Sequence, residues 1–543
     1  MLGPLAAGLL VLLVHLPSLG NGFHYDDGHS LLRNPHVRSL AGMPRFFTDA
    51  TTFSAEPQFA MYRPLVVTSL ALDYAWAGYR PLPFHATNLL IHVAATVLAG
   101  VVLLQLGFAP AASAVGAMVF GLHPTQTEVV NYVSSRSESL AGLLCLAAMA
   151  AYLRGTRSAP RAAVSYQAAS LLAFAAALLC KATALALPVG LALHQVLQPA
   201  GARRASALRR HLPYWALAAA YVAAYGWLSG AGMQRAAAVR PWQAQLATQA
   251  KAVVHYVHRA CTPVGLSVCP QFWESGSPAD PVPLAGLTLA VSVAWLLWRA
   301  RRSPVLCFAA CWFAVMLAPA LAIPLHVLVN DHRLYLSLLA MAVAAAWAWT
   351  HLRGRTPVVV ALLVMAVLST QRDRVWRDEV SLWTDAAARS PRVPEAQYNL
   401  GHALQAAGSY EAARAAYERA VAVSPAYPEA LANLGVLYRQ AGDLERAQQV
   451  LRDALASQPD LTEAQNTLGL VYRDMGRLQD AAQVLEEALQ QHPDLAEAHY
   501  NLGLVYRDAG KVELAFQHLR RAVELKPELK SAYPPQPAPL PGG

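Results

Sequence analysis

Two adjacent carboxylates follow the first apolar stretch of the chain. Residues 5–19 form an apolar run that is long enough to cross most of a bilayer, and Asp26 and Asp27 come shortly after it. Carboxylates close to lipid are costly unless a partner or a reaction needs them. A carboxylate at this place is suited to taking a proton from a hydroxyl group. The alternative is a solvated turn or a helix cap, which Asp-Asp-Gly also favours.

Further polar residues recur beside later apolar segments. They are His123 and Glu128 in His-Pro-Thr-Gln-Thr-Glu, then Arg136 and Glu138, then Lys181, and finally His332, Arg333 and Tyr335 in Asp-His-Arg-Leu-Tyr. Arginine and lysine side chains bind phosphate groups, and glutamate and histidine can hold a sugar or a metal. Each residue alone is consistent with a solvated loop charge. Because charges near lipid are costly, the whole set favours one composite site.

The pattern demands neither a metal nor a disulfide framework. Asp26, Asp27, Glu128 and His332 are suitable metal ligands, but nothing in their spacing requires a metal, so we expect none and leave a divalent ion as the alternative. Six cysteines are too few for a disulfide scaffold. Cys261 and Cys269, near an outer loop, would be able to pair if that side is oxidising.

The composition is that of a membrane protein with a different C-terminal part. The 543 residues are 55% hydrophobic and only 14% charged, against about 25% charged in a typical soluble domain. Residues 1–390 carry a net charge of about +14 and residues 391–543 about −5. The basic residues cluster at helix ends rather than in one patch, so the overall charge of +9 does not indicate nucleic-acid binding.

Apolar segments predict eleven membrane spans in a domain of residues 1–371. They cover residues 3–20, 84–105, 110–123, 136–153, 164–180, 182–198, 212–229, 283–298, 304–323, 334–351 and 356–371. The arginine-rich loops then share one face, which the positive-inside rule makes cytoplasmic, and the acidic residues lie on the other face with the loop 21–62. Residues 63–78 and 243–261 are expected to be helices at the outer interface.

The C-terminal part contains four tetratricopeptide repeats. Proline, Leu-Gly, glycine and alanine positions recur with a period of 34 residues, which predicts units over residues 394–427, 428–461, 462–495 and 496–529 within a repeat domain of residues 392–530. Each unit is two antiparallel helices, and stacked units form an α-solenoid with a concave face. Residues 372–391 connect the two domains, and the proline-rich tail 531–543 is expected to be disordered.

One register position of the repeats is suited to binding a peptide backbone. Asn399, Asn433 and Asn501 precede the Leu-Gly pair in three units, and Thr467 replaces them in the remaining one. A ladder of amides can hydrogen-bond an extended peptide without reading its side chains. The alternative is bonding between the helices themselves.

The order of these motifs resembles the transmembrane and tetratricopeptide repeat-containing protein O-mannosyltransferases and their bacterial relatives. The matching stretches are Tyr25-Asp26-Asp27, Tyr62-Arg63-Pro64-Leu65, His92, His123-Pro124 with Glu128, Arg136 with Glu138, and His332-Arg333-Leu334-Tyr335-Leu336, followed by the repeats. Two departures are the short array of four repeats and Asp331-His332 at the place where the family has a glutamate near the arginine.

The resemblance implies an all-α polytopic domain of the GT-C glycosyltransferase fold. It implies transfer of a sugar, mannose in the family, from a polyprenyl-phosphate donor to Ser or Thr of proteins on the extracytoplasmic face. Asp26 or Asp27 is the implied base, with Glu128 as a further catalytic residue. Arg63, His123, Arg136, Glu138, Lys181, His332, Arg333 and Tyr335 are the implied donor-binding residues. High Ala and Arg usage indicates a GC-rich bacterium, hence the inner membrane with a periplasmic repeat array; in a eukaryote the array would be in the ER lumen.

Two other functions fit the same sequence. A non-enzymatic scaffold would anchor the repeats to the membrane, and its acidic residues would be dispensable. A ligase or polymerase of lipid-linked glycans would share the topology but use a glycan acceptor. A peptide-binding repeat groove favours protein as the acceptor.

Overall fold

The computed structural model describes residues 1–197, 204–228, 241–276, 281–286, 288, 303–322 and 327–532. Every regular element in these ranges is helical, which confirms the predicted all-α fold. The chain divides into two compact units, residues 1–385 and 386–543. The predicted span 283–298 lies largely outside the described residues, and the tail from residue 533 lies wholly outside them.

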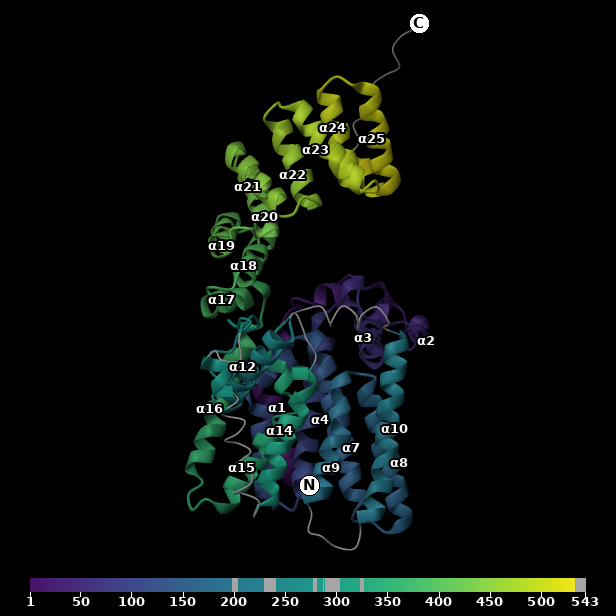
Figure 1. The fold of residues 1–543 in the computed structure, drawn as a ribbon, viewed down its shortest axis with the longest axis vertical. Coiled ribbons are helices and arrows are strands. Elements are labelled where there is room, and N and C mark those ends of the chain that lie inside the picture. Colours follow the sequence, from purple (N-terminus) through teal and green to yellow (C-terminus); the bar gives the residue numbers. More distant parts are fainter. Residues whose placement is uncertain are drawn as a thin grey trace. The chain divides into compact units, whose positions relative to one another are not determined.

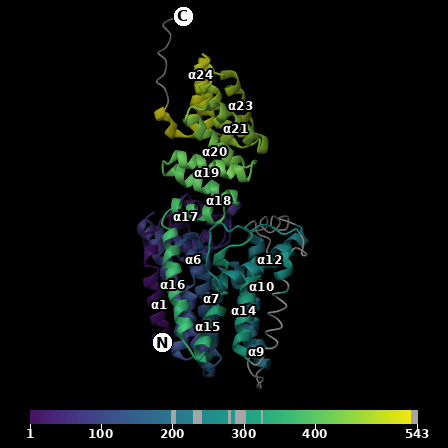
Figure 2. The same ribbon diagram turned by 90° about the vertical axis from the view of Figure 1, so that its left-hand side faces the viewer.

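The first unit is a set of long helices with shorter elements at one end (Figures 1 and 2). Its helices are α1 (Leu2–Val14), α2 (Met43–Phe46), α3 (Pro64–Ala77), α4 (Pro81–Gln105), α5 (Pro110–Leu122), α6 (Thr127–Asn131), α7 (Arg136–Gly155), α8 (Pro160–Leu178), α9 (Leu187–Leu197), α10 (Arg204–Leu228), α12 (Trp242–Cys261), α14 (Pro304–Ala322), α15 (Leu339–His351) and α16 (Thr356–Val375). Proline stands at the first position of α3, α4, α5, α8 and α14. A backbone N–H at this position has no acceptor within the helix, so the absence of this group in proline costs no hydrogen bond.

Three of these helices, α4, α8 and α14, are long and apolar enough to cross a membrane. The chain is therefore a membrane protein. Several other helices also expose apolar side chains, such as Leu363 and Val367 on α16, which lipid would cover. The eleven spans and their orientation remain predictions.

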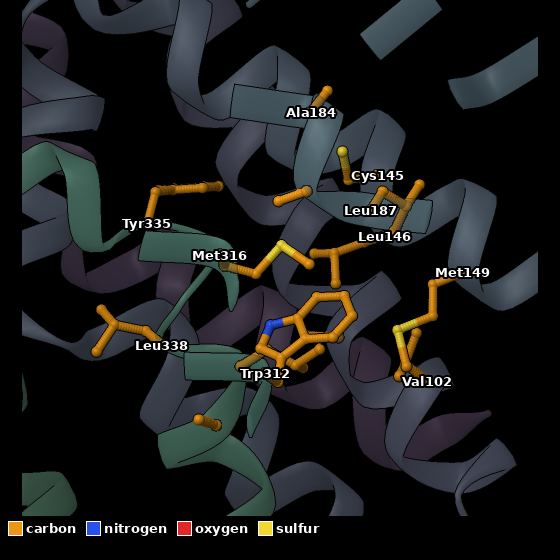
Figure 3. Close-up of a cluster of buried hydrophobic side chains, with 14 of the residues drawn as sticks. Val102, Cys145, Leu146, Met149, Ala184, Leu187, Trp312, Met316, Tyr335 and Leu338 are labelled. Carbon is orange, nitrogen blue, oxygen red and sulfur yellow. The ribbon is translucent and has the colours of Figure 1, made fainter. Parts of the chain in front are cut away.

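The apolar core joins helices that are far apart in the sequence. Trp312 and Met316 of α14 pack beside Leu146 of α7 and Leu187 of α9 (Figure 3). Close packing depends on small residues as well: a Cβ on Gly116 would lie 2.5 Å from a backbone oxygen in α15. This core supports the shorter elements at the end of the bundle, where the candidate residues lie.

The second unit consists of paired helices. α17 (Glu379–Arg389) crosses the boundary between the units. The pairs are α18 (Pro394–Ala406) with α19 (Tyr410–Val423), α20 (Pro428–Gln440) with α21 (Leu444–Ser457), α22 (Thr462–Asp474) with α23 (Leu478–Gln491), and α24 (Ala496–Asp508) with α25 (Val512–Leu525). The turn glycines Gly408, Gly442, Gly476 and Gly510 have φ of 75° to 78°, a conformation that glycine adopts without strain.

Candidate active site

The two adjacent carboxylates have different environments. Asp27 is fully buried, and its oxygens accept hydrogen bonds from the backbone N–H of His24 (3.0 Å) and from the N–H and hydroxyl of Ser134 (2.8 and 2.6 Å). Burial raises the pKa of Asp27 to about 6. All of these contacts hold the loop in place, so Asp27 ties residues 24–27 to the turn before α7.

Asp26 is accessible. Its side chain is 44% exposed, and one carboxylate oxygen lies 3.4 Å from Nε2 of His29. Its backbone N–H donates to the Tyr132 hydroxyl at 3.2 Å. The preceding Tyr25 has a φ of +50°, a rare value for a residue with a side chain. Strained backbone of this kind concentrates at functional sites, where surrounding contacts enforce it.

Glu128 and His332 form a buried pair between α6 and the turn before α15. Oε1 of Glu128 and Nδ1 of His332 are 2.8 Å apart. Burial raises the pKa of Glu128 to about 8 and lowers the pKa of His332 to about 3. Both shifts favour the neutral forms, so near pH 7 the two groups share one proton and add no net charge to the site.

Lys181 and Glu138 form a second pair nearby, with 2.7 Å between Nζ and Oε1. Burial lowers the pKa of Lys181 to about 8, opposed by Glu138 and assisted by Arg63. Arg63 donates to the Ser137 hydroxyl at 3.0 Å, and its guanidinium lies over the Phe53 ring. Burial lowers the pKa of Arg63 as well, and Glu138 and Asp26 oppose that shift.

Mutual electrostatic effects thus join most of the predicted residues into one cluster. Lys181 acts on His332, and Arg333 acts on both of them. Arg63 connects these groups to Asp26. We call this set the polar cluster: Asp26, Arg63, Glu128, Glu138, Lys181, His332 and Arg333. The polar cluster contains three basic side chains, Arg63, Lys181 and Arg333, and two carboxylates besides the neutral Glu128–His332 pair, so it is suited to an anionic group.

Other predicted residues are engaged in packing. The Arg136 guanidinium is fully buried, 2.6 Å from Asp73, and donates to Asn88 Oδ1 (2.7 Å) and to the carbonyl of Phe84 (2.9 Å). These contacts leave little of the guanidinium for a ligand. Arg136 therefore joins α7 to α3 and α4.

His123 and Tyr335 are also buried. Nε2 of His123 lies 3.1 Å from the Ala260 carbonyl, which connects α5 to α12. The Tyr335 hydroxyl lies 3.0 Å from Nδ1 of His92, and its ring fills the space beside Gly142. Arg333, by contrast, donates to the carbonyls of Leu328 and Val327 and stays partly exposed.

The repeat asparagines make contacts between successive units. Nδ2 of Asn433 donates to the Tyr398 hydroxyl at 3.4 Å, and Nδ2 of Asn501 donates to Asn466 at 2.7 Å. Asn501 is buried, whereas Asn399 and Asn433 are partly exposed. Two of the three predicted side chains are thus partly exposed, and their role in peptide binding stays a prediction.

Within the described ranges, no three His, Cys, Asp or Glu side chains are arranged to hold a metal ion. Cys261 and Cys269 are not joined to each other by a disulfide, so the pairing considered from the sequence is not formed.

Some residues that shape the site were not predicted. Tyr132, Ser134 and Glu379 contact the loop that carries Asp26. Tyr132 and Ser134 lie in the sequence between the predicted residues Glu128 and Arg136, and this position could have indicated that they belong to the site. Glu379 stands in the predicted connector, and nothing in its local sequence indicates its partner.

Known proteins resemble this chain over part of its length. Two family models described as tetratricopeptide repeat match residues 404–470 and 466–529, which confirms the predicted repeats. The protein O-mannosyl-transferase Tmtc2 of Drosophila melanogaster is 34% identical over 198 residues, which cover 35% of this chain and 21% of that protein. Tmtc1 of the same organism is 31% identical over 195 residues, covering 35% of this chain and 22% of that protein. Human TMTC3 is 29% identical over 140 residues, covering 25% and 15%.

The predicted resemblance to protein O-mannosyl-transferases is thereby confirmed. The chain matches only about a fifth of the length of the first two relatives. Similar solved structures include MamA, 24% identical over 28% of this chain and 90% of that chain, with a TM-score of 0.26. Another is YrrB, titled a TPR protein with an unusual peptide-binding site, 22% identical over 31% of this chain and 84% of that chain, with a TM-score of 0.25.

Proposed function

We propose that this chain is a membrane glycosyltransferase of the GT-C type. It transfers a sugar, mannose by analogy with the names of its relatives, from a polyprenyl phosphate to Ser or Thr hydroxyls of proteins on the extracytoplasmic face. The repeat unit binds the acceptor protein. For a bacterial chain, this places the enzyme in the inner membrane with its repeats in the periplasm.

The observation that carries the proposal is the accessible carboxylate of Asp26, which interacts electrostatically with Arg63 of the polar cluster. In the proposed reaction, Asp26 takes the proton from the acceptor hydroxyl while the hydroxyl oxygen attacks the anomeric carbon. The bond from that carbon to the phosphate oxygen breaks, and the configuration inverts. Arg63, Lys181 and Arg333 stabilise the charge of the departing lipid phosphate.

The neutral Glu128–His332 pair supports the same proposal. An ionised Glu128 would repel the phosphate, but burial holds its pKa at about 8. The pair therefore offers a hydrogen-bonding surface to the sugar without an added negative charge. No step requires a metal ion, and none is included.

The test is sugar transfer by purified protein in lipid. Wild type, Asp26→Asn and Asp49→Asn are supplied with polyprenyl-phosphate mannose and Ser/Thr-rich peptides. Asp49 is the matched control because it lies in the same loop and pairs with Arg45 on the surface. We expect transfer by wild type and Asp49→Asn, and a loss of about 100-fold or more in Asp26→Asn.

Other lipid-linked sugars and glycan acceptors complete the test. Transfer to glycan alone would make the chain a ligase or polymerase. Absence of transfer from every lipid-linked donor would contradict the proposal and favour a scaffold.

A further inference from the structure

The segment between the last helix of the first unit and the repeats is held against the Asp26 loop by several contacts. Residues 372–385, here called the clamp segment, contain the end of α16 and the first turns of α17. All of the contacts described below lie within the first compact unit.

Glu379 makes the most direct contact with the loop. Its Oε1 accepts a hydrogen bond from the backbone N–H of Tyr25 at 2.9 Å and lies 3.4 Å from Nδ1 of His24. Its Oε2 accepts a hydrogen bond from Nε1 of Trp383 at 2.5 Å. Both carboxylate oxygens are therefore used, one on the loop and one on the next turn of α17. The Tyr25 N–H that Glu379 binds belongs to the residue with a φ of +50°.

Aromatic rings continue this contact around Asp26. The Trp376 ring stacks on Tyr132, with centroids 5.8 Å apart, and both rings are buried. The Tyr132 hydroxyl accepts the backbone N–H of Asp26. The Trp383 ring meets the Tyr25 ring edge-on at 5.6 Å. The residues immediately before and at the proposed base are thus positioned from the clamp segment.

The clamp segment is itself fixed to the helical bundle. The Asp373 carboxylate lies 2.8 Å from Nδ1 of His15, at the end of α1, and accepts from Nδ2 of Asn131 at 2.6 Å. Arg372 pairs with Asp385, which closes the segment on itself. At the start of the loop, the Arg377 carbonyl accepts a hydrogen bond from the N–H of Gly22. These contacts fix the clamp segment both to the bundle and to the start of the loop.

We propose that the clamp segment is part of the active site, with Glu379 as a positioning residue that fixes the strained Tyr25 backbone and through it Asp26. This inference rests on the proposed function, because it assigns Asp26 the role of base. The clamp segment ends within α17, which crosses the boundary to the unit that carries the repeats.

The isosteric variant Glu379→Gln separates positioning from gross structural damage. An amide has one acceptor oxygen, so it is unable to accept from both Tyr25 and Trp383, and its NH₂ group faces a donor. We expect kcat to fall at least about tenfold, with KM for the lipid donor within about twofold of wild type, because a small displacement of a catalytic group acts on the chemical step.

A second substitution makes the test specific. In Glu379→Gln/Trp383→Phe the indole N–H is gone, so the amide oxygen is free to accept from Tyr25. We expect this double variant to be more active than Glu379→Gln alone. Trp383→Phe alone keeps the Glu379–Tyr25 bond and a ring beside Tyr25, so it should lower kcat less than Glu379→Gln does.

Hydrogen–deuterium exchange supplies a readout that does not depend on activity. In the full chain, Glu379→Gln should speed exchange of the amides in residues 22–30. The control Glu56→Gln, which alters partly exposed contacts with Arg33 and Gln58, should not. Unchanged exchange and unchanged kcat in Glu379→Gln overturn the inference. An inactive wild type whose residues 22–30 still loosen in Glu379→Gln contradicts the proposed function but supports the clamp.

Discussion

Asp26 and Asp27 are neighbours of the same chemical type, yet the structure gives them different tasks. The accessible Asp26 is available to a substrate hydroxyl, whereas each oxygen of the buried Asp27 accepts bonds that hold the loop. Asp27→Asn would place an amide NH₂ opposite a backbone or hydroxyl donor. We expect it to lower the free energy of unfolding by about 1–3 kcal/mol, measured by thermal unfolding in detergent.

Asp26→Asn should show the opposite pattern, with kcat reduced and the melting temperature unchanged. The two single variants therefore separate the base from its support. An Asp27→Asn protein that is stable but inactive, together with an active Asp26→Asn protein, would exchange the two roles.

Lys181 gives the site a pH dependence. Its pKa is about 8 in the folded protein against an ordinary 10.5, so the ammonium that would bind the lipid phosphate is lost as pH rises above 8. We expect KM for the donor to rise up to about tenfold per pH unit above that value. Lys181→Arg should remove the rise, because a guanidinium stays charged. A wild-type KM that is flat to pH 9.5 would contradict the assignment.

The same shift has a consequence for stability with a defined sign. The unfolded chain binds the Lys181 proton more tightly than the folded protein between pH 8 and 10.5. This residue therefore contributes stability that is present above pH 10.5 and is lost as pH falls to 8.

At the scale of helices, Arg136 is predicted to act through packing. Its guanidinium and the Asp73 carboxylate join α7 to α3 in a buried pair. Removing one partner leaves an uncompensated buried charge, so Arg136→Met should cost about 3–5 kcal/mol of unfolding free energy. In the double variant Asp73→Asn/Arg136→Met the remaining charge is gone, and thermal unfolding should show a smaller loss than Arg136→Met alone. A stable Arg136→Met protein with a raised donor KM would instead make Arg136 a phosphate ligand.

Helix type and repeat register were accessible from the sequence because they depend on local signals. Apolar runs, proline at helix starts and the period of 34 residues are all visible without a structure. The sequence did not show which polar residues belong to the polar cluster and which are engaged in packing. Arg63 and Arg136 look alike in sequence, and what separates them is the arrangement of partners such as Asn88, 48 residues before Arg136. Glu379 was missed for the same reason, since its partner Tyr25 lies 354 residues away.

At the scale of the whole molecule, the repeats would make the proposed enzyme select a protein acceptor over a simple alcohol. Successive units are connected at equivalent positions, Arg439 with Asp474 at 2.6 Å and Arg473 with Asp508 at 2.5 Å. These ion pairs recur at equivalent positions of successive units. If the array binds the acceptor, the partly exposed Asn399 and Asn433 would contact an extended backbone one repeat apart.

The repeat asparagines provide a matched test of that role. Asn433 is partly exposed and makes only a long bond of 3.4 Å to Tyr398, whereas the buried Asn501 makes a bond of 2.7 Å to Asn466. If the array binds acceptor backbone, Asn433→Ala should raise KM about three- to tenfold for an acceptor long enough to reach the repeats, since a lost hydrogen bond is worth about 0.5–1.5 kcal/mol. It should leave KM unchanged for a short Ser/Thr peptide. Asn501→Ala, at the same register position, should lower the melting temperature of the repeats instead. Equal effects of Asn433→Ala on long and short acceptors would mean that the array does not select the substrate, and the repeats would then serve another partner.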